Sequence, residues 1–503
     1  MAGDPHAWTE TELKLLLTPH AERALKAHDI FRSAAKGGRI LTTYFDTPDD
    51  VLNRRGLSLR VRRSGEKRVQ TLKWQAEESP GISRSEWEWP IDREEPDLHL
   101  VENTPIADRL PLSLAPDLEP VIVTDVVRTT QTLHLEKGTT VEAAFDHGSI
   151  VVGDAREPIR ELELDLQSGE IGPLLRLALD LHASVPFTLG VESKATRGYH
   201  IRSGIAPQAR KAAAPYLERN ITADAAIRRI ITVELGFLLA NLPAARAGDA
   251  EGVHQMRVGI RRLRSVLILF SDHLEPHAAG AFQKALKQMG KIFGEARDWD
   301  VFCLEALPNA VDRADNIGWT HLLRTAAAEP RAAAHAAFVR AADSPAFVNL
   351  ALGMAAWAED GAALLKKDQP LRSLAPDLLD RLQDKVDDRG RGLKKLDEGE
   401  LHALRKSLKK LRYGVEYLAS LYPPKAVKAY LKRCKAVQKR LGAINDIVMA
   451  MRRIEELAGR GRTDLGGALA AIAQALREPR RRAREKLKKK WADFKDEPRF
   501  WRE

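Results

Sequence analysis

The N-terminal stretch Glu10-Thr11-Glu12-Leu13-Lys14 carries a charged side chain at every second position. Successive side chains of a β-strand point to opposite faces, so Glu10, Glu12 and Lys14 would share one face. A single strand of this kind has two interpretations. It is either a half-exposed strand with a solvated face, or a strand lining a polar cavity that holds a metal and an anion. Further strands with the same alternation would favour the cavity.

The same alternation recurs in later segments of the N-terminal half, with apolar residues between the charged ones. The charged residues are Arg60 and Arg62; Arg84, Glu86 and Glu88; Glu161, Glu163 and Asp165; and Glu192 and Lys194, with Lys73, Arg128 and Asp146 in further strand-like runs. Charges of both signs on so many strands favour one closed antiparallel barrel with a charged interior over a set of solvated faces.

The bulk composition bounds the class of protein. A chain of 503 residues is too long for one core, so two or three domains are expected. It has no run of about 18 apolar residues and no signal-peptide pattern, so we expect no membrane partner. The two cysteines, Cys303 and Cys434, exclude a disulfide framework and a thiolate metal site, and they suit a reducing, cytoplasmic location.

Charge is unevenly distributed along the chain. Residues 1–204 contain 25 Lys+Arg and 33 Asp+Glu, which leaves 55 and 37 for residues 205–503. The basic half is therefore expected to meet a polyanion. Strand alternation ends before a Pro- and Ala-rich linker at 205–215, and helical periodicity follows. We predict an α+β, multidomain chain with a strand domain at 1–204 and an all-α domain of eight to ten helices at 216–503.

The helical half contains an internal repeat, with copies at about 216–366 and 367–495. A shift of 148 residues superimposes two segments without a gap. The matched pairs are His254/His402, Arg257/Arg405, Arg261/Lys409, Arg264/Arg412, Lys284/Lys432, Lys287/Lys435, Lys291/Lys439, Gly294/Gly442 and Asp298/Asp446. We therefore predict two related helical bundles.

The charged strands together suit a metal–phosphate ligand. Carboxylate clusters suit Mg²⁺ or Mn²⁺, which commonly work with substrate phosphates, and surrounding Arg and Lys suit a linear triphosphate. Glu10-x-Glu12-x-Lys14, followed in order by the other charged strands, resembles the CYTH domain of the triphosphate tunnel metalloenzymes over residues 5–202. The resemblance implies an eight-stranded antiparallel β-barrel tunnel that hydrolyses or cyclises triphosphorylated compounds with a divalent metal.

The resemblance also implies roles for individual residues. The metal ligands would be Glu10, Glu12, Asp146, Glu161 and Glu163; the phosphate-binding residues would be Lys14, Arg60, Arg62, Lys73, Arg128 and Lys194; and Glu10, Glu12, Lys14 and Lys73 would be catalytic. Family members act on inorganic triphosphate, thiamine triphosphate or ATP, the last including adenylyl cyclases. Inorganic triphosphate needs no base pocket and is the preferred substrate, because Trp74, Trp87 and Trp89 are more typical of strand packing.

The helical half carries basic stripes. On a helix over Val253–Phe270, a stripe falls within an arc of about 80°, and apolar residues face the other way. The stripe residues are His254, Arg257, Arg261 and Arg264, with His402, Arg405, Lys409 and Arg412 in the second copy. A second row is Lys284, Lys287 and Lys291, with Lys432, Lys435 and Lys439. A solvated face would explain one stripe. However, the stripe is repeated and contains almost no acidic residues to offset repulsion between its cations, which favours an anionic ligand.

These repeats resemble a CHAD domain over about residues 216–495. The resemblance implies binding of long-chain inorganic polyphosphate and association with polyphosphate granules. Nucleic acid is the rival ligand for the basic run Arg477–Lys490, but no reading motif or aromatic platform accompanies it, so nucleic acid is disfavoured. A non-catalytic granule scaffold is the rival to the enzyme, although binding a polyanion alone would not require the acidic pairs.

Overall fold

The computed structural model describes residues 8–9, 11–31, 37–74, 85–308, 317–359, 364–459 and 465–502 of the chain. Packing within the chain separates two compact units. The first contains Met1–Gln208 and Asp343–Glu359, and the second contains Ala209–Ala342 and Asp360–Glu503. Residues 205–215 contain neither helix nor strand. Within the described ranges, no helix combines the length and apolarity needed to cross a bilayer.

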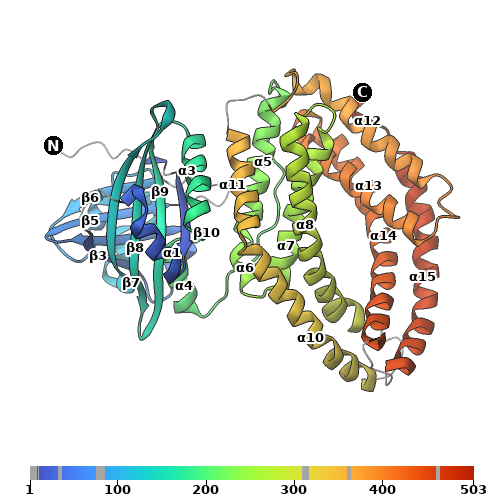
Figure 1. The fold of residues 1–503 in the computed structure, drawn as a ribbon, viewed down its shortest axis with the longest axis horizontal. Helices are drawn as coiled ribbons and strands as arrows, with labels where there is room; N and C mark the ends of the chain where they lie inside the picture. The colour runs from blue at the N-terminus through green and yellow to red at the C-terminus, as the bar shows by residue number, and fades with distance from the viewer. Residues whose placement is uncertain are drawn as a thin grey trace. The chain divides into compact units, whose positions relative to one another are not determined.

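The first unit is built on one antiparallel sheet (Figure 1). Its strands among the described residues are β1 (Trp8–Thr9), β2 (Glu12–Leu17), β3 (Gly38–Asp46), β4 (Leu57–Ser64), β5 (Lys67–Trp74), β6 (Ser85–Ile91), β7 (Glu119–His134), β8 (Thr140–Val152), β9 (Ala155–Ser168) and β10 (Phe187–Gly190). They follow the order β1-β6-β5-β4-β3-β7-β8-β9-β2-β10. This order runs between two ends, so the predicted antiparallel sheet is present but its closure into a barrel is not established.

Helices and short 3₁₀ turns surround this sheet. The helices of the first unit are α1 (Pro19–Ala27), α2 (Val51–Arg54), α3 (Ile171–Ser184), α4 (Lys194–Ser203) and α11 (Pro345–Glu359). Helix α11 lies in the sequence of the first predicted repeat, yet it packs on α3 and β10. Its apolar sequence accounts for this, since Phe347, Leu350 and Met354 are all buried.

The alternation predicted for the strands is present in the sheet. On β4, Leu57, Leu59 and Val61 are buried in an apolar cluster beneath the chain segment that follows β6. The charged residues that alternate with them, Arg60 and Arg62, face the opposite side of the sheet. The predicted polar face is therefore separated from the hydrophobic core by a single layer of strands.

One local prediction is wrong. Glu192 and Lys194 were expected to alternate on a strand, but β10 ends at Gly190 and Lys194 is the first residue of α4. Ser193 caps this helix, because its Oγ accepts a hydrogen bond from the Thr196 backbone N–H at 3.1 Å. The capping serine, rather than the spacing of the two charges, decides the local structure.

The second unit is helical, which confirms the α+β organisation. Its helices in the described ranges are α5 (Ala223–Ala240), α6 (Leu242–Arg246), α7 (Ala250–Leu269), α8 (Pro276–Val301), α10 (Ile317–Ala342), α12 (Leu371–Gly390), α13 (Glu398–Tyr417), α14 (Pro424–Gly459) and α15 (Gly466–Lys495). Helix α7 packs on α8, α13 packs on α14, and α7 also packs on α13. The repeated segments thus occupy equivalent helix pairs that meet through α7 and α13. The apolar face predicted for α7 is buried, as at Met256, Ile260 and Leu263.

Candidate functional site

A charged cavity of about 600 Å³ lies within the first unit. Side chains from strands β2 to β9 and from helix α4 line it. The basic lining residues are Lys14, Arg60, Arg62, Lys73, Arg128 and Lys194, and the acidic ones are Glu12, Glu86, Glu88, Glu142, Asp146, Glu163 and Asp165. Nine of the eleven residues predicted from the N-terminal half therefore meet at one cavity. Of the other two, Glu10 lies outside the described residues, and Glu161 contacts Lys194.

Strand register brings the charged residues together. Asp146 lies opposite Glu161 across β8 and β9, and Lys14 lies opposite Glu163 across β2 and β9. Arg128 lies opposite Asp146 across β7 and β8. Because directly opposite residues share one face of a sheet, acids and bases from four strands point into the same space.

Three carboxylates form a buried acidic cluster. Asp146, Glu161 and Glu163 are 0%, 1% and 7% exposed, and oxygen atoms of all three lie within 4.8 Å of one another. We refer to these three residues as the acidic cluster. A divalent metal fits this donor set, because hard cations prefer several carboxylate oxygens.

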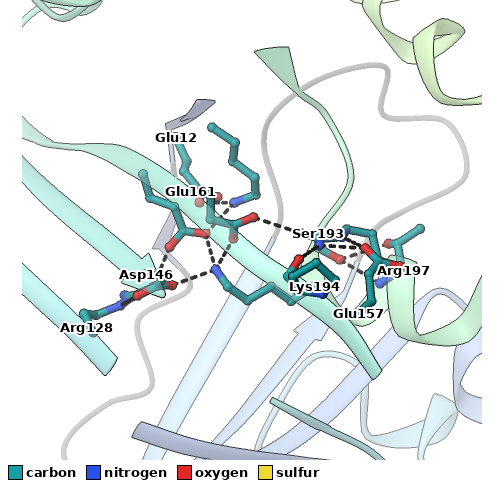
Figure 2. Close-up of polar contacts among 12 residues, drawn as sticks. Glu12, Arg128, Asp146, Glu157, Glu161, Ser193, Lys194 and Arg197 are labelled. Atoms are coloured by element: carbon teal, nitrogen blue, oxygen red, sulfur yellow. Dashed lines mark hydrogen bonds and ion pairs between the residues drawn. The ribbon is translucent and has the colours of Figure 1, made fainter. Parts of the chain in front are cut away.

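Lys194 occupies the centre of the acidic cluster (Figure 2). Its Nζ lies 2.8 Å from Asp146 Oδ2 and 2.8 Å from Glu163 Oε1, and it also contacts Glu161. Burial would lower the pKa of Lys194, but the three carboxylates outweigh it and raise the pKa above its ordinary value. The ammonium therefore supplies the positive charge that buried carboxylates require, and a metal ion would have to displace it.

Arg128 and Lys14 complete the neutralisation of these acids. Arg128 lies 2.6 Å from both Asp146 Oδ2 and Glu163 Oε2. Lys14 Nζ lies 3.1 Å from Glu163 Oε1 and also contacts Glu12. Burial would raise the pKa of Glu163, yet Lys14, Lys194 and Arg128 hold it well below its ordinary value. Glu163 is thus ionised at neutral pH.

The wall formed by β4 and β5 is more basic. Arg60 lies 3.3 Å and Lys73 lies 2.9 Å from carboxylate oxygens of Glu86. Within the described residues, no carboxylate lies within 4.0 Å of Arg62, and its buried Nε has no hydrogen-bond partner. Repulsion by Arg60, burial and Arg128 lower the pKa of Arg62 to about 10. A buried guanidinium without a counter-ion is a suitable binding site for an anion.

Several cavity residues were left out of the predicted site. Glu86 and Glu88 alternate on β6, Asp165 follows Glu163 by two positions, and Glu142 shares the face of Asp146 on β8. All four carried the same spacing signal as the predicted residues. Arg197 lies outside the cavity lining but contacts Glu161, and it carried no such signal, because it lies on α4, which begins where a strand was predicted.

The helical unit brings its two basic stripes together. Arg257 and Arg261 on α7, and Arg405 and Lys409 on α13, influence one another's charge. We refer to these four residues as the basic seam. Arg257 Nη1 donates to Asp298 Oδ1 at 2.6 Å, and Arg261 Nε donates to the Tyr413 hydroxyl at 2.8 Å.

The other predicted helical residues differ in surroundings. Arg264 and Arg412 are half-buried on the same two helices, whereas the row residues Lys284, Lys287, Lys291, Lys432, Lys435 and Lys439 are exposed. Burial and Arg297 lower the pKa of His254 to about 4. His402 Nδ1 lies 2.9 Å from Asn445 Oδ1. Among the described residues, the group that could hold a metal consists of Asp146, Glu161 and Glu163, and it includes neither histidine.

Each half of the chain matches a known domain family. Residues 9–199 match the CYTH domain family, and residues 229–455 match the CHAD domain family. An inorganic triphosphatase of Haemophilus influenzae is 30% identical over 202 residues, which cover 39% of this chain and 55% of that relative. The chain thus spans about half the length of this curated relative.

Solved structures include relatives of each half. The CHAD domain from the plant Ricinus communis is 29% identical, with a TM-score of 0.50 over 57% of this chain and 97% of that chain. A Hippeastrum protein, described as a candidate adenylyl cyclase with a dominant triphosphatase activity, is 20% identical. Its TM-score is 0.31, over 39% of this chain and 96% of that chain.

Proposed function

The chain joins a CYTH domain to a CHAD domain, and we propose that the first hydrolyses inorganic triphosphate with a divalent metal while the second binds long-chain inorganic polyphosphate. The observation that carries the enzymatic part is the convergence of six cations and seven acids on one cavity. Support also comes from the Haemophilus relative, which is named an inorganic triphosphatase.

We infer that the cavity is a tunnel closed by the N-terminal strand. Segment β1 pairs with β6, and segment β2 pairs with β9. The two segments are separated by only two residues in the sequence, so the N-terminal segment would join the two ends of the remaining sheet. That arrangement has eight strands around the cavity.

The balance of charge supports a metal-bound substrate. The lining cations and acids nearly cancel, so a polyanion such as triphosphate would leave an excess of negative charge. Divalent cations bound with the substrate would remove this excess, and Mg²⁺ and Mn²⁺ suit carboxylate and phosphate oxygens. The acidic cluster would hold such an ion, which supplies charge neutralisation and activation of water when bound.

The residues of the chain would then divide the remaining work. Arg60 and Arg62 would bind the non-transferred phosphates, and Lys73 would neutralise charge that develops on the leaving group. Lys14 and Lys194, released from their carboxylates when a metal binds, would be free to contact phosphate oxygens. In this scheme catalysis consists of positioning and electrostatic stabilisation.

Inorganic triphosphate is preferred over nucleotides as the substrate because the tryptophans near the cavity are poorly placed to stack on a nucleobase. Trp87 is buried in the core, and Trp89 packs against the same core. Trp74 lines the cavity, but it also packs on that core, and Arg109 already stacks on its ring at 4.9 Å. Thiamine triphosphate and ATP are the alternative substrates, with cyclic AMP as the product of a cyclase.

The enzymatic proposal predicts phosphate release that depends on the cavity cations. The full-length protein should release phosphate from triphosphate with Mg²⁺ or Mn²⁺, and faster than from ATP or thiamine triphosphate. Arg62→Gln should lower kcat/KM by about 100- to 1,000-fold, because a buried charge aimed at the phosphates is lost. Arg39→Gln, which alters an arginine that is 70% exposed and pairs with Asp125, is the matched control.

Three results would reject this assignment. The first is absence of release with either metal, the second is equal activity of the two variants, and the third is cyclic AMP as the main product from ATP. A non-catalytic scaffold corresponds to the first result. Polyphosphate-granule association and a cytoplasmic location stay predictions that imaging of the tagged chain would test.

The polyphosphate part rests on the basic seam, where cations outnumber nearby acids. Replacing Arg405 and Lys409 together by Gln should weaken binding of long-chain polyphosphate and flatten its dependence on salt, because fewer counterions are released. Arg391→Gln is the control, since Arg391, just after α12, is exposed and already paired with Asp388. Equal salt slopes for all three proteins, or equal affinity for single-stranded DNA, would contradict the proposed ligand.

A further inference from the structure

The basic seam holds positive charge that its surroundings do not balance. Arg257 has an acidic partner, Asp298. Arg261 donates to the neutral hydroxyl of Tyr413. Across the described parts of the chain, no carboxylate lies within 4.0 Å of Arg261, Arg405 or Lys409. Three half-buried cations from both repeats therefore share one space without a paired acid.

Lysine is the member of this group that can relieve the repulsion. Arginine keeps its proton under all ordinary conditions, whereas a lysine amine loses its proton when burial and like charges disfavour the ammonium. Four arginines surround Lys409: Arg257 and Arg261 from α7, and Arg405 and Arg412 from α13. His254 on α7 is a neighbouring titratable group, and Asp446 on α14 is the nearby acid.

The charge state of Lys409 follows from these neighbours. Burial lowers the pKa of Lys409, and repulsion by Arg261 and Arg405 lowers it further, to about 5. Burial also raises the pKa of Asp446, the nearby acid on α14. These surroundings favour the uncharged amine of Lys409 in the ligand-free protein.

We propose that phosphate binding at the basic seam is coupled to proton uptake by Lys409, so that the helical domain holds polyphosphate more tightly as the pH falls. The coupling rests on the polyphosphate binding proposed above. An anion placed among these cations provides the missing negative charge and restores the ammonium form of Lys409. The proton comes from the solvent and is held on Nζ, and no covalent bond forms or breaks.

The expected size of the effect follows from linkage. Uptake of one proton makes the affinity fall with rising pH by up to about tenfold per pH unit, between the pKa values of the free and bound states. A group that starts uncharged and ends charged gives this sign, because protons then act as a second ligand that favours the bound state. An always-charged group at the same position would give no such dependence.

The internal repeat supplies a matched variant. The equivalent of Lys409 in the first copy is Arg261, so Lys409→Arg introduces a residue that the fold already accommodates at the repeat-related position. This variant stays charged when ligand-free and has no proton to take up. It should therefore bind polyphosphate with a flatter pH dependence, and at about pH 8.5 it should bind more tightly than the wild-type protein.

Calorimetry measures the proton directly. Long-chain inorganic polyphosphate is titrated into the full-length protein at about pH 7.5, in two buffers with different ionisation enthalpies. The wild-type protein should take up more protons than Lys409→Arg. Lys428→Arg is the control, because Lys428 is exposed on α14, lies outside the predicted basic rows and should leave the proton uptake unchanged. Titration of the chain ends of the ligand is common to all three proteins and cancels in the comparison.

A measurement without ligand guards against a variant that fails to fold. Neutral lysine amines react with acetic anhydride, so acetylation of the wild-type protein, read by mass spectrometry, should show no rise at Lys409 with pH across the neutral range. The rate at free Nα-acetyl-lysine in the same solution should rise throughout that range. A parallel rise at Lys409 would overturn the proposal, as would equal proton uptake by the wild-type protein and Lys409→Arg. Failure of the wild-type protein to bind polyphosphate at any pH would instead overturn the proposed function.

Discussion

At the scale of single residues, Arg197 orients one carboxylate of the acidic cluster. Its Nη1 donates to Glu161 Oε2 at 3.0 Å, its Nε donates to Glu157 Oε1 at 2.7 Å, and its Nη2 donates to the Pro158 carbonyl at 3.0 Å. With one oxygen of Glu161 fixed by a planar guanidinium, the other contacts Lys194 (Figure 2). Arg197 is thus a positioning residue for the acidic cluster, comparable to groups that orient metal ligands.

Loss of the contact between Arg197 and Glu161 should act mainly on metal affinity. Arg197→Gln is expected to reduce affinity for Mn²⁺ by about tenfold to 100-fold, because Glu161 loses its orienting donor. Titration calorimetry of Mn²⁺ into the substrate-free, full-length protein measures this independently of turnover. Arg202→Gln is the control, since Arg202 lies on the same helix but pairs with Asp50 and Glu119. Equal Mn²⁺ affinities for the two variants would remove this role.

The residue scale also shows what strand spacing could and could not predict. Arg62 and Glu163 could be assigned to a shared cavity, because their positions follow from a period of two that is visible in the sequence. Arg197 could not, because its contact depends on how α4 packs against β9. The lack of an acid paired with Lys409 could not be predicted from the sequence either, because it depends on which side chains a second helix brings close to Lys409.

At the scale of elements, ion pairs and hydrogen bonds join the C-terminal segment, residues 499–502, to acidic residues of α12. Arg499 lies 2.9 Å from an oxygen of Asp380 and 2.7 Å from one of Asp384, and Trp501 Nε1 donates to Asp380 at 2.9 Å. Arg502 also pairs with Asp380. Trp501 and its neighbour Phe500 are buried, so ion pairs and apolar packing hold the segment together.

The ion pairs and hydrogen bonds of Asp380 predict a loss of stability in acid. Burial opposes ionisation of Asp380, but hydrogen bonds from Trp501, Arg502 and Arg499 lower its pKa below the ordinary value. A carboxyl group whose pKa is lower in the folded state stabilises the protein above its unfolded pKa of about 4, and this contribution disappears as the pH falls through the folded value. The contribution should therefore be constant near neutrality and absent in strong acid.

Denaturation of Asp380→Asn beside the wild-type protein tests this linkage. The variant should be less stable at about pH 7, by about 1 kcal/mol because the group is partly exposed, and the difference should shrink below about pH 4. Asp388→Asn is the control on the same helix, since Asp388 is exposed and pairs with Arg391 three residues away. A difference that stays constant down to about pH 2 would show that charge on Asp380 is not responsible.

Elements also differ in how well the sequence predicts them. The strands were predictable where charged and apolar residues alternate over several positions, as on β4 and β9. Helix α4 was assigned wrongly because Glu192 and Lys194 imitate that spacing across a helix cap at Ser193. Lys194 still reaches the cavity, because the first turn of α4 brings its side chain to the acidic cluster.

At the scale of the whole molecule, two signals in the sequence anticipated the organisation. The change of net charge and the 148-residue repeat separate a mixed-charge sheet unit from a basic helical unit. The allocation of α11 to the first unit was not predictable, because its apolar sequence fits a helical bundle as well as it fits a place on α3. Only packing distinguishes the two.

Each proposed site is built from residues of one unit, and this predicts that the two functions separate. Glu163→Gln should reduce triphosphate hydrolysis by at least about 100-fold, because the acidic cluster loses a charge. Polyphosphate affinity should stay unchanged, since the seam residues belong to the second unit and the cavity lining belongs to the first. The double replacement of Arg405 and Lys409 by Gln should do the reverse. Phosphate release and polyphosphate titration on the same protein preparations provide both readouts. If either variant altered both functions, energetic coupling between the units would be required, because no residue is common to the two sites.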